Sequence, residues 1–198
     1  MVITYHGNGC FRIQSGPLSL LLDPQNARMK PDIFIKTLVP WPPEEFAERK
    51  GEERGITGPG EYEQKGVRIW GFPVREESDK KFLKTMYVVE MEELRLAFLG
   101  HLSSTPNRDA FEEFDKIDIL FIPAGGKPFL SPEAAAKLVK QLSPVIAIPS
   151  FAKSPKEFAK ELGQSVEPSE KFVVKKKDLP PSGSKATARI QVVALREI

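Results

Sequence analysis

Short apolar runs separated by glycine and proline fill the first part of the chain, and this spacing constrains the fold more than any other feature. Val2–His6, Cys10–Gln14 and Leu18–Leu22 are short and apolar or alternating, and each is followed by turn residues. Ile33–Ile35 is β-branched or aromatic throughout, which is typical of a buried strand. The pattern predicts a β-rich first half, with further strands over Gly58–Glu63, Val67–Phe72, Thr85–Met91 and Leu94–Leu99.

The clearest helix signals lie in the second half of the chain. Ser131–Glu133 supplies a capping serine, a first-turn proline and an acidic first turn, so the sequence predicts a helix that ends near Leu142. Ser154–Glu157 repeats these signals, and Gly163 supplies the stop. Two more helical segments are predicted over Glu44–Lys50 and Asn107–Lys116, and strands over Asp118–Ile122, Val145–Ile148, Phe172–Lys175 and Thr187–Leu195. Strands followed by alternating strands and helices predict one layered α/β domain over residues 1–198, with mixed sheets.

Composition excludes several classes of protein. The 198 residues include 29 Lys and Arg against 27 Asp and Glu, and a net charge of +2 argues against a nucleic-acid partner. A single cysteine excludes an intrachain disulfide and a thiolate metal cluster. The sequence has neither a secretory signal pattern nor the roughly 18 apolar residues in a row that a membrane helix needs. A cytoplasmic protein without a membrane partner is therefore expected.

Five blocks of sequence, in order along the chain, resemble the metallo-β-lactamase-fold hydrolases. They are Ile3–Phe11 with Leu20–Pro24, Gly58–Ile69, Leu94–Gly100, Asp118–Gly126 and Glu133–Pro149. The similarity is greatest to the compact branch that includes the ascorbate-phosphate lactonase-like zinc-dependent hydrolases. This resemblance implies a four-layer αββα sandwich, in which two mixed sheets are flanked by helices and the site lies at the sheet edges.

The resemblance also implies a two-metal site, and here the chain departs from the family. The family motif His-x-His-x-Asp-His follows the strand that ends near Thr37, but this chain has apolar residues and prolines there, which cannot bind zinc. His101 replaces the bridging aspartate of the family, and Phe151 stands where a later histidine ligand is expected. The former ligand positions are thus occupied by Leu38, Pro40, Pro42, Pro43, His101 and Phe151. Two histidines cannot supply a binuclear centre, so the sequence predicts no metal ligand, no catalytic residue and no cofactor.

A few residues remain as weak candidates for chemistry. His101 is either a residual acid, base or lone metal ligand, or a hydrogen-bonded loop histidine beside a vestigial pocket. Asp23 is either the cap of an Asp-Pro turn or the carboxylate partner of a His6–His101 metal pair. Where the metals would lie, we expect Trp41 and Phe151 to fill the space, with Phe151 and Leu38 largely buried.

The favoured function is that of a non-catalytic, metal-free pseudoenzyme kept for binding or assembly, with a second copy of the chain as the first partner expected. Whether it is an enzyme stays open, with the balance against it. The alternative is a metal-dependent hydrolase of phosphoesters or lactones that uses zinc at a non-standard site near His101. A second alternative is a degenerate nuclease-like module that binds nucleic acid, against which the balanced charge counts.

Overall fold

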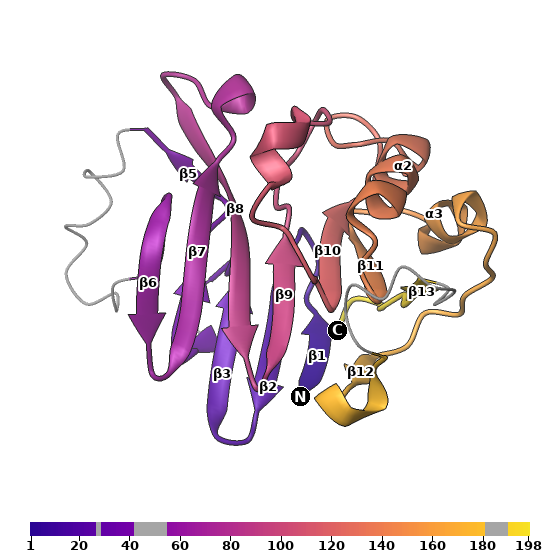
Figure 1. Cartoon of the computed structure of the whole chain (residues 1–198), viewed down its shortest axis with the longest axis horizontal. Coiled ribbons are helices and arrows are strands. Elements are labelled where there is room, and N and C mark those ends of the chain that lie inside the picture. The colour runs from indigo at the N-terminus through magenta and orange to yellow at the C-terminus, as the bar shows by residue number, and fades with distance from the viewer. Residues whose placement is uncertain (27–28, 42–54, 181–189) are drawn as a thin grey trace.

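Two mixed β-sheets pack face to face in the computed structural model, which describes residues 1–26, 29–41, 55–180 and 190–198 (Figure 1). The five-stranded sheet has the order β12-β1-β2-β3-β4, with β1 at Val2–Tyr5, β2 at Phe11–Ser15, β3 at Leu18–Leu22, β4 at Ile33–Ile35 and β12 at Lys171–Val173. The eight-stranded sheet has the order β13-β11-β10-β9-β8-β7-β6, with β5 paired to β8 off this path. Its strands are β5 at Leu38–Pro40, β6 at Gly60–Gln64, β7 at Val67–Pro73, β8 at Phe82–Met91, β9 at Leu94–Phe98, β10 at Ile119–Pro123, β11 at Ile146–Ser150 and β13 at Gln191–Val192.

Alternation along the first strands sends one set of side chains into the space between the sheets. In β2, Phe11, Ile13 and Ser15 are buried while Arg12 and Gln14 are half-buried, and Ile13 pairs with Leu20 of β3. These side chains share one core with residues of the facing sheet, such as Val89 and Phe121. Each fully buried side chain of this size contributes roughly 1.5–3 kcal/mol. The hydrophobic core therefore fixes the register in which the two sheets meet.

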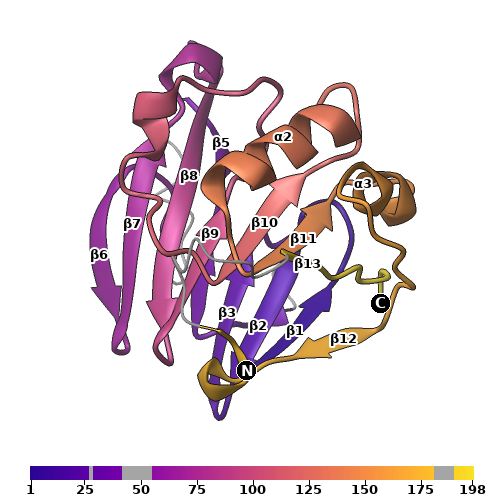
Figure 2. The ribbon, with the colours of Figure 1, turned by 45° about the vertical axis from the view of Figure 1, so that its right-hand side comes forward.

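The central strands of the larger sheet are covered on both faces. β9, β10 and β11 run parallel to one another, and all residues of β10 and β11 are buried. One face meets the first sheet, and the other packs against α2 (Pro132–Leu142) and α3 (Pro155–Glu161), as Figure 2 shows. Continuous apolar runs in these strands follow from this double burial.

The helix α2 confirms the boundaries predicted from its caps. The Ala134 N–H donates to Ser131 Oγ at 3.2 Å, Pro132 occupies the first turn, and Ser143 closes the helix in a left-handed conformation at φ 48°. The helix α3 likewise begins at the predicted proline. Three short 3₁₀ turns complete the described elements: η2 at Arg75–Glu77, η3 at Arg108–Phe111 and η4 at Lys176–Asp178.

The α/β class and the two mixed sheets are confirmed, and one local prediction is wrong. The expected helix over Asn107–Lys116 is reduced to the 3₁₀ turn η3. Phe111 and Phe114 are three residues apart, so a turn with three residues per repeat buries both without a longer helix. The helix predicted over Glu44–Lys50 lies outside the described residues, as does the start of the segment predicted over Thr187–Leu195. Among the described residues, no helix is long and apolar enough to cross a membrane.

Candidate functional site

The end of β3 delivers a buried carboxylate to the sheet edge. Asp23 follows β3 at φ 45°, and its backbone N–H donates to the Ile35 carbonyl at 2.8 Å. Its carboxylate accepts two bonds from Thr37, which lies between β4 and β5: the Thr37 N–H donates to Oδ1 and the Thr37 hydroxyl donates to Oδ2, each at 2.7 Å. The turn aspartate and the strand that should carry the metal motif are thus joined by two hydrogen bonds.

His101 completes a three-residue chain that we call the polar wall. It follows β9, and its Nδ1 lies 2.8 Å from Thr37 Oγ1 and 3.8 Å from Asp23 Oδ2. The turn before it depends on Gly100, which has φ 57° and lies so close to Thr37 that an added Cβ would collide with that side chain. The structure therefore brings together the two weak candidates, Asp23 and His101, through a threonine.

Burial shifts the pKa values of both ends of the polar wall, in opposite directions. Burial raises the pKa of Asp23 to about 6, although the hydrogen bonds from Thr37 and the charge of Lys36 act against this. Burial also lowers the pKa of His101 to about 4, and the nearby Lys84 charge adds to the effect. At neutral pH the pair therefore consists of an ionised carboxylate and a neutral imidazole.

A second carboxylate holds the loop that follows His101. Glu77 accepts bonds from the backbone N–H and the hydroxyl of both Ser103 and Ser104, and Lys84 Nζ donates to it at 2.7 Å. The same ammonium donates to the His101 carbonyl at 2.9 Å. Burial alone would raise the pKa of Glu77, but the bonds from Lys84, Ser103 and Ser104 outweigh it and hold that pKa at about 2. This network fixes the backbone that carries His101.

Two phenylalanines, which we call the aromatic wall, lie against the other side of His101. Phe129 and Phe151 stack with ring centroids 4.0 Å apart and planes at 20°, and the His101 ring lies 5.0 Å from Phe151. Phe151 is left-handed at φ 56°, an uncommon conformation for a large residue. Gly9 and Gly125 make room for it, because a Cβ at Gly9 would collide with its ring and one at Gly125 with its carbonyl.

The former ligand positions divide into those that fill the site and those that do not. Phe151 packs beside His101, but it is only half-buried, short of the large burial expected. Leu38 is also only half-buried, short of the burial expected. The prediction that Trp41 packs over the site is wrong: β5 ends at Pro40, and the indole keeps 51% of its surface exposed. Pro42 and Pro43 lie outside the described residues.

A zinc centre does not fit the described residues. Within residues 1–26, 29–41, 55–180 and 190–198, no group of three or more His, Cys, Asp or Glu side chains is placed to hold a metal. Both Asp23 oxygens and the His101 Nδ1 are bonded to Thr37, so Nε2 is the one ring nitrogen of His101 without a partner among the described residues. His6 contacts Thr4 at 3.2 Å, and the suggested His6–His101–Asp23 set does not form among the described residues.

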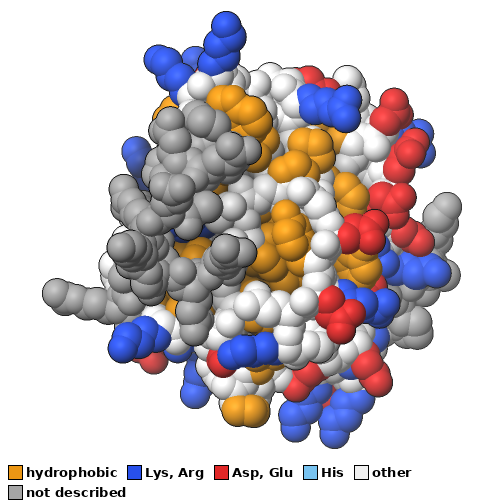
Figure 3. Space-filling view, turned by 90° about the vertical axis from the view of Figure 1, so that its left-hand side faces the viewer, with side chains coloured by type: hydrophobic (Ala, Val, Ile, Leu, Met, Phe, Trp, Pro, Cys, Tyr) orange, Lys and Arg blue, Asp and Glu red, His pale blue; other side chains and the backbone are white. Residues whose placement is uncertain are grey.

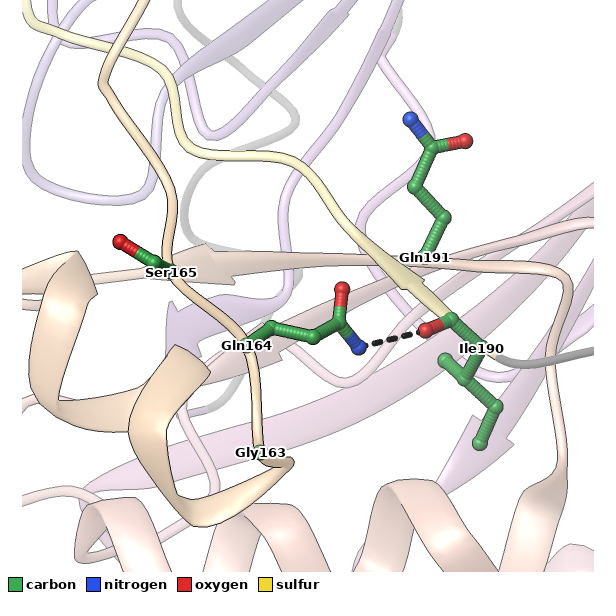
Figure 4. A pocket seen from close by; sticks show the side chains of 5 residues that line it. All are labelled: Gly163, Gln164, Ser165, Ile190 and Gln191. Carbon is green, nitrogen blue, oxygen red and sulfur yellow. Dashed lines mark hydrogen bonds between the residues drawn. The ribbon is translucent and has the colours of Figure 1, made fainter.

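A separate hollow lies beside α3 and β13, lined by Gly163, Gln164, Ser165, Ile190 and Gln191, with a volume of about 380 Å³. Figure 4 shows the Gln164 amide turned onto β13, whereas the Ser165 and Gln191 side chains point in other directions. Gln164 donates to the Ile190 carbonyl at 2.6 Å and accepts from the Val192 N–H at 3.0 Å. Its amide thus bonds two backbone groups that a neighbouring strand would otherwise bond. Among the described residues that line this hollow, none has a titratable side chain.

Sequence analysis missed two members of this site. Thr37 directly precedes the altered motif, and nothing in a lone threonine distinguishes it. Phe129 lies in the loop after β10, near Gly125 and Gly126, and nothing in the sequence of this loop links it to His101. The usable signal was spacing: Thr37 is the last residue before the former ligands and so must lie at the sheet edge.

The fold and the site together define the class. Two mixed sheets pack face to face with their polar residues at the strand ends, which is the metallo-β-lactamase type of α/β sandwich. The chain belongs to the β-lactamase superfamily domain family, whose model matches residues 2–150. The recognised family and the predicted fold class are both confirmed.

Several known proteins are similar to this chain. UPF0173 protein PF0020 of Pyrococcus furiosus is 39% identical over 70 residues, a match that spans 32% of this chain and 33% of that relative. A Thermotoga maritima structure, provisionally assigned as a Zn-dependent hydrolase of the metallo-β-lactamase superfamily, matches with a TM-score of 0.76 at 24% identity, covering 98% of this chain and 99% of that one. Igni18, a metallo hydrolase of Ignicoccus hospitalis, gives 0.69 at 16% identity, with coverages of 88% and 99%. At these identities, the structural likeness shows the fold alone.

Proposed function

We propose that this chain is a non-catalytic, metal-free member of the superfamily, kept for binding or assembly. The observation that carries the proposal is the aromatic wall. Where the family resemblance places a histidine ligand, Phe151 stacks on Phe129 and lies 5.0 Å from His101. A phenyl ring has no lone pair for a metal, and Phe151 packs closely against Gly9 and Gly125 at this edge.

The polar wall supports the same conclusion from the other side. The family's bridging ligand is an aspartate, and His101 in its place uses Nδ1 to bond Thr37. Asp23 uses both oxygens on the same threonine. Recruiting His101 through Nδ1, or turning the Asp23 carboxylate away from Thr37, would break hydrogen bonds of a buried network, at a cost of about 1–3 kcal/mol for each polar group left unpaired.

Metal retention combined with an activity screen tests this proposal. Purified protein is loaded with zinc or manganese, dialysed and analysed for metal, and then assayed on phosphodiester, phosphomonoester and lactone substrates. We expect well under one metal per chain and no turnover above that of the His101→Ala variant. Stoichiometric metal that survives dialysis and is lost in His101→Ala, or turnover that this variant abolishes, would overturn the proposal.

An assembly role makes a second copy of this chain the first partner to test. Trp41 and Phe82 keep 51% and 44% of their surfaces exposed; Phe82 lies on β8, and Trp41 directly follows Pro40, the residue of β5 that pairs with Phe82. Figure 3 shows that hydrophobic side chains gather in the middle of the β6 side of the molecule, bordered by charged residues. Light scattering over a range of concentrations should give a multiple of the chain mass that falls in the Trp41→Ser/Phe82→Ser variant. A monomer at every concentration would remove the assembly half of the proposal.

One observation favours a second candidate, a hydrolase that uses a non-standard site near His101. The imidazole retains one nitrogen, Nε2, that no described residue bonds, and a buried carboxylate stands behind the ring. A neutral imidazole in this arrangement can accept a proton from water or a hydroxyl group. The activity screen separates the two candidates, because only the hydrolase predicts turnover that depends on His101.

A further inference from the structure

The hydroxyl of Thr37 has two partners but only one proton. On one side lies Asp23, which is a carboxylate above its pKa of about 6 and can then only accept. Its Oδ1 takes the Thr37 N–H and its Oδ2 takes the hydroxyl proton, both at 2.7 Å. On the other side, His101 Nδ1 lies 2.8 Å from the same oxygen.

The hydrogen bonds of the Thr37 hydroxyl determine which ring nitrogen of His101 carries the proton. Since the Thr37 hydroxyl proton is given to Asp23, its oxygen can only accept from the ring, so Nδ1 must carry the hydrogen of the neutral imidazole. Nε2 then holds a bare lone pair. Across the part of the chain that the structure describes, no residue bonds Nε2, and the side chain keeps 18% of its surface exposed, so solvent reaches the ring.

We propose that Thr37 is a positioning residue that holds His101 as the Nδ1–H tautomer, and that the residual site thereby takes a neutral ligand that donates an O–H or N–H to Nε2. This inference deepens the proposed binding role and rests on it. It replaces the metal-bound site that the family resemblance implies with a single oriented hydrogen-bond acceptor.

The surroundings of His101 favour a neutral ligand over an anion. Burial is the main cause of the lowered His101 pKa and the Lys84 charge adds to it, but the Lys84 ammonium is already shared between Glu77 and the His101 carbonyl. The ionised Asp23 lies 3.8 Å from Nδ1, so the charge nearest the ring on its other side is negative. The aromatic wall adds apolar surface rather than charge. An incoming donor with an aromatic or aliphatic body matches these features.

Gly100 gives a second route to the same relay. Its Cα lies against Thr37 so closely that a methyl group there would collide with the Thr37 Cβ and Oγ1. Gly100→Ala should therefore displace the hydroxyl without removing any polar group of the relay.

Nitrogen NMR of the two histidines tests the tautomer directly. Correlation of ring protons with ring nitrogens distinguishes a bare nitrogen from a protonated one, and His6→Asn assigns the two rings because the chain has only two histidines. At about pH 8, well above the Asp23 pKa, we expect His101 in the wild type to show a protonated Nδ1 and a bare Nε2. Thr37→Ser should keep this state, whereas Thr37→Val and Gly100→Ala should lose it.

The result on the wild type alone is decisive if a variant does not fold. A protonated Nε2 in the wild type, or an unchanged tautomer in a folded Thr37→Val protein, would overturn the positioning role. A merely structural threonine would change stability in Thr37→Val and leave the tautomer as it is.

Titration with two probes tests the class of ligand. Phenol, a neutral O–H donor, should move the Nε2 resonance toward that of a protonated nitrogen, whereas inorganic phosphate should not. Thr37→Val should weaken the phenol response at least several-fold. No response to phenol, or a larger one to phosphate, would overturn the ligand class. Neither outcome bears on metal retention or turnover, so failure here is distinguishable from failure of the proposed function.

Discussion

The polar wall and the aromatic wall meet at His101 and stabilise the same edge of the sandwich by different physics. The polar wall relies on directional bonds, in which each Thr37 contact has one geometry and one proton assignment. The aromatic wall relies on filled space, where Phe151 is held by Phe129 and by the two glycines that leave room for it. The comparison teaches that one side should respond to pH and the other to side-chain volume.

The largest effect is expected from emptying the aromatic wall. Phe151→Ala should lower the free energy of unfolding by about 3 kcal/mol, because it leaves a cavity between Phe129 and Gly9. Gly9→Ala should be costly in the wild type, since the methyl group meets the Phe151 ring and φ is 79°. In the Phe151→Ala background only the backbone strain remains, roughly 1 kcal/mol. Denaturant unfolding of the two single variants and the double variant measures the coupling. Additive effects would show that the ring and Gly9 do not touch.

The polar wall should reveal itself as two opposing pH dependences. Between about pH 4 and 6, folded Asp23 binds more protons than the unfolded residue, whose pKa is 3.8, so its contribution to stability falls as pH rises. Folded His101 binds fewer protons than the unfolded residue between about pH 4 and 6.5, so its contribution rises with pH. At about 1.4 kcal/mol per pKa unit, each shift corresponds to roughly 3 kcal/mol. In the wild type they largely cancel.

Single substitutions should expose each limb of this pH dependence. Asp23→Asn should leave stability that increases from pH 4 to 6.5, and His101→Asn should leave stability that decreases over the same range. Unfolding measured at several pH values checks the sign of each slope. His6→Asn is the control, because burial lowers the pKa of His6 but the ring is only partly buried. Equal slopes in the two variants would mean that the wall does not hold these charge states.

A smaller effect is expected at the loop network beneath the polar wall. Glu77→Gln keeps the shape of the side chain but removes the negative charge that pairs with Lys84. It should lower the free energy of unfolding by about 1–2 kcal/mol at neutral pH. Because the Glu77 pKa is held at about 2, that stability is present above its unfolded value of 4.5 and lost as pH falls toward 2. Among the described residues, its neighbour Glu76 accepts one hydrogen bond, from the Asn107 amide at 3.3 Å, and Glu76→Gln is a matched control that should change little. Similar losses of stability in Glu77→Gln and Glu76→Gln would contradict the proposed role of Glu77 in holding the loop.

The smallest effect is expected outside both walls. Trp41→Ala should change the free energy of unfolding by less than about 1 kcal/mol, because half of the indole is already in solvent. Trp70→Ala should lower the free energy of unfolding more. That ring packs against the buried cluster that includes α2 and α3, and it lies under the Arg68 and Arg95 guanidinium groups. Thermal melting compares the two. An equal loss of stability in the two variants would instead indicate that the Trp41 side chain packs into the site.

Sequence reasoning reached most of the fold because the relevant signals are local. The Ser131 cap, the alternating pattern of β2 and the apolar run of β10 each predict their secondary structure from neighbouring residues alone. The site was only half accessible, because its contacts join residues far apart in the chain: Thr37 and His101 are separated by 64 positions. The loss of ligands could be predicted from residue chemistry, whereas the different burial of the two aromatic residues expected to fill the site could not. Trp41 and Phe151 are both aromatic, and only packing distinguishes the exposed one from the one that fills the edge.

The bonds at Glu77 also set a timescale. Ser103 and Ser104 are exposed residues, and backbone amides at such positions ordinarily exchange their hydrogens with water quickly. Here both amides donate to one carboxylate, at 2.9 Å and 2.7 Å. Their exchange with deuterium therefore requires that these hydrogen bonds break. The exchange rate of these two surface amides thus reports how often the loop behind His101 opens.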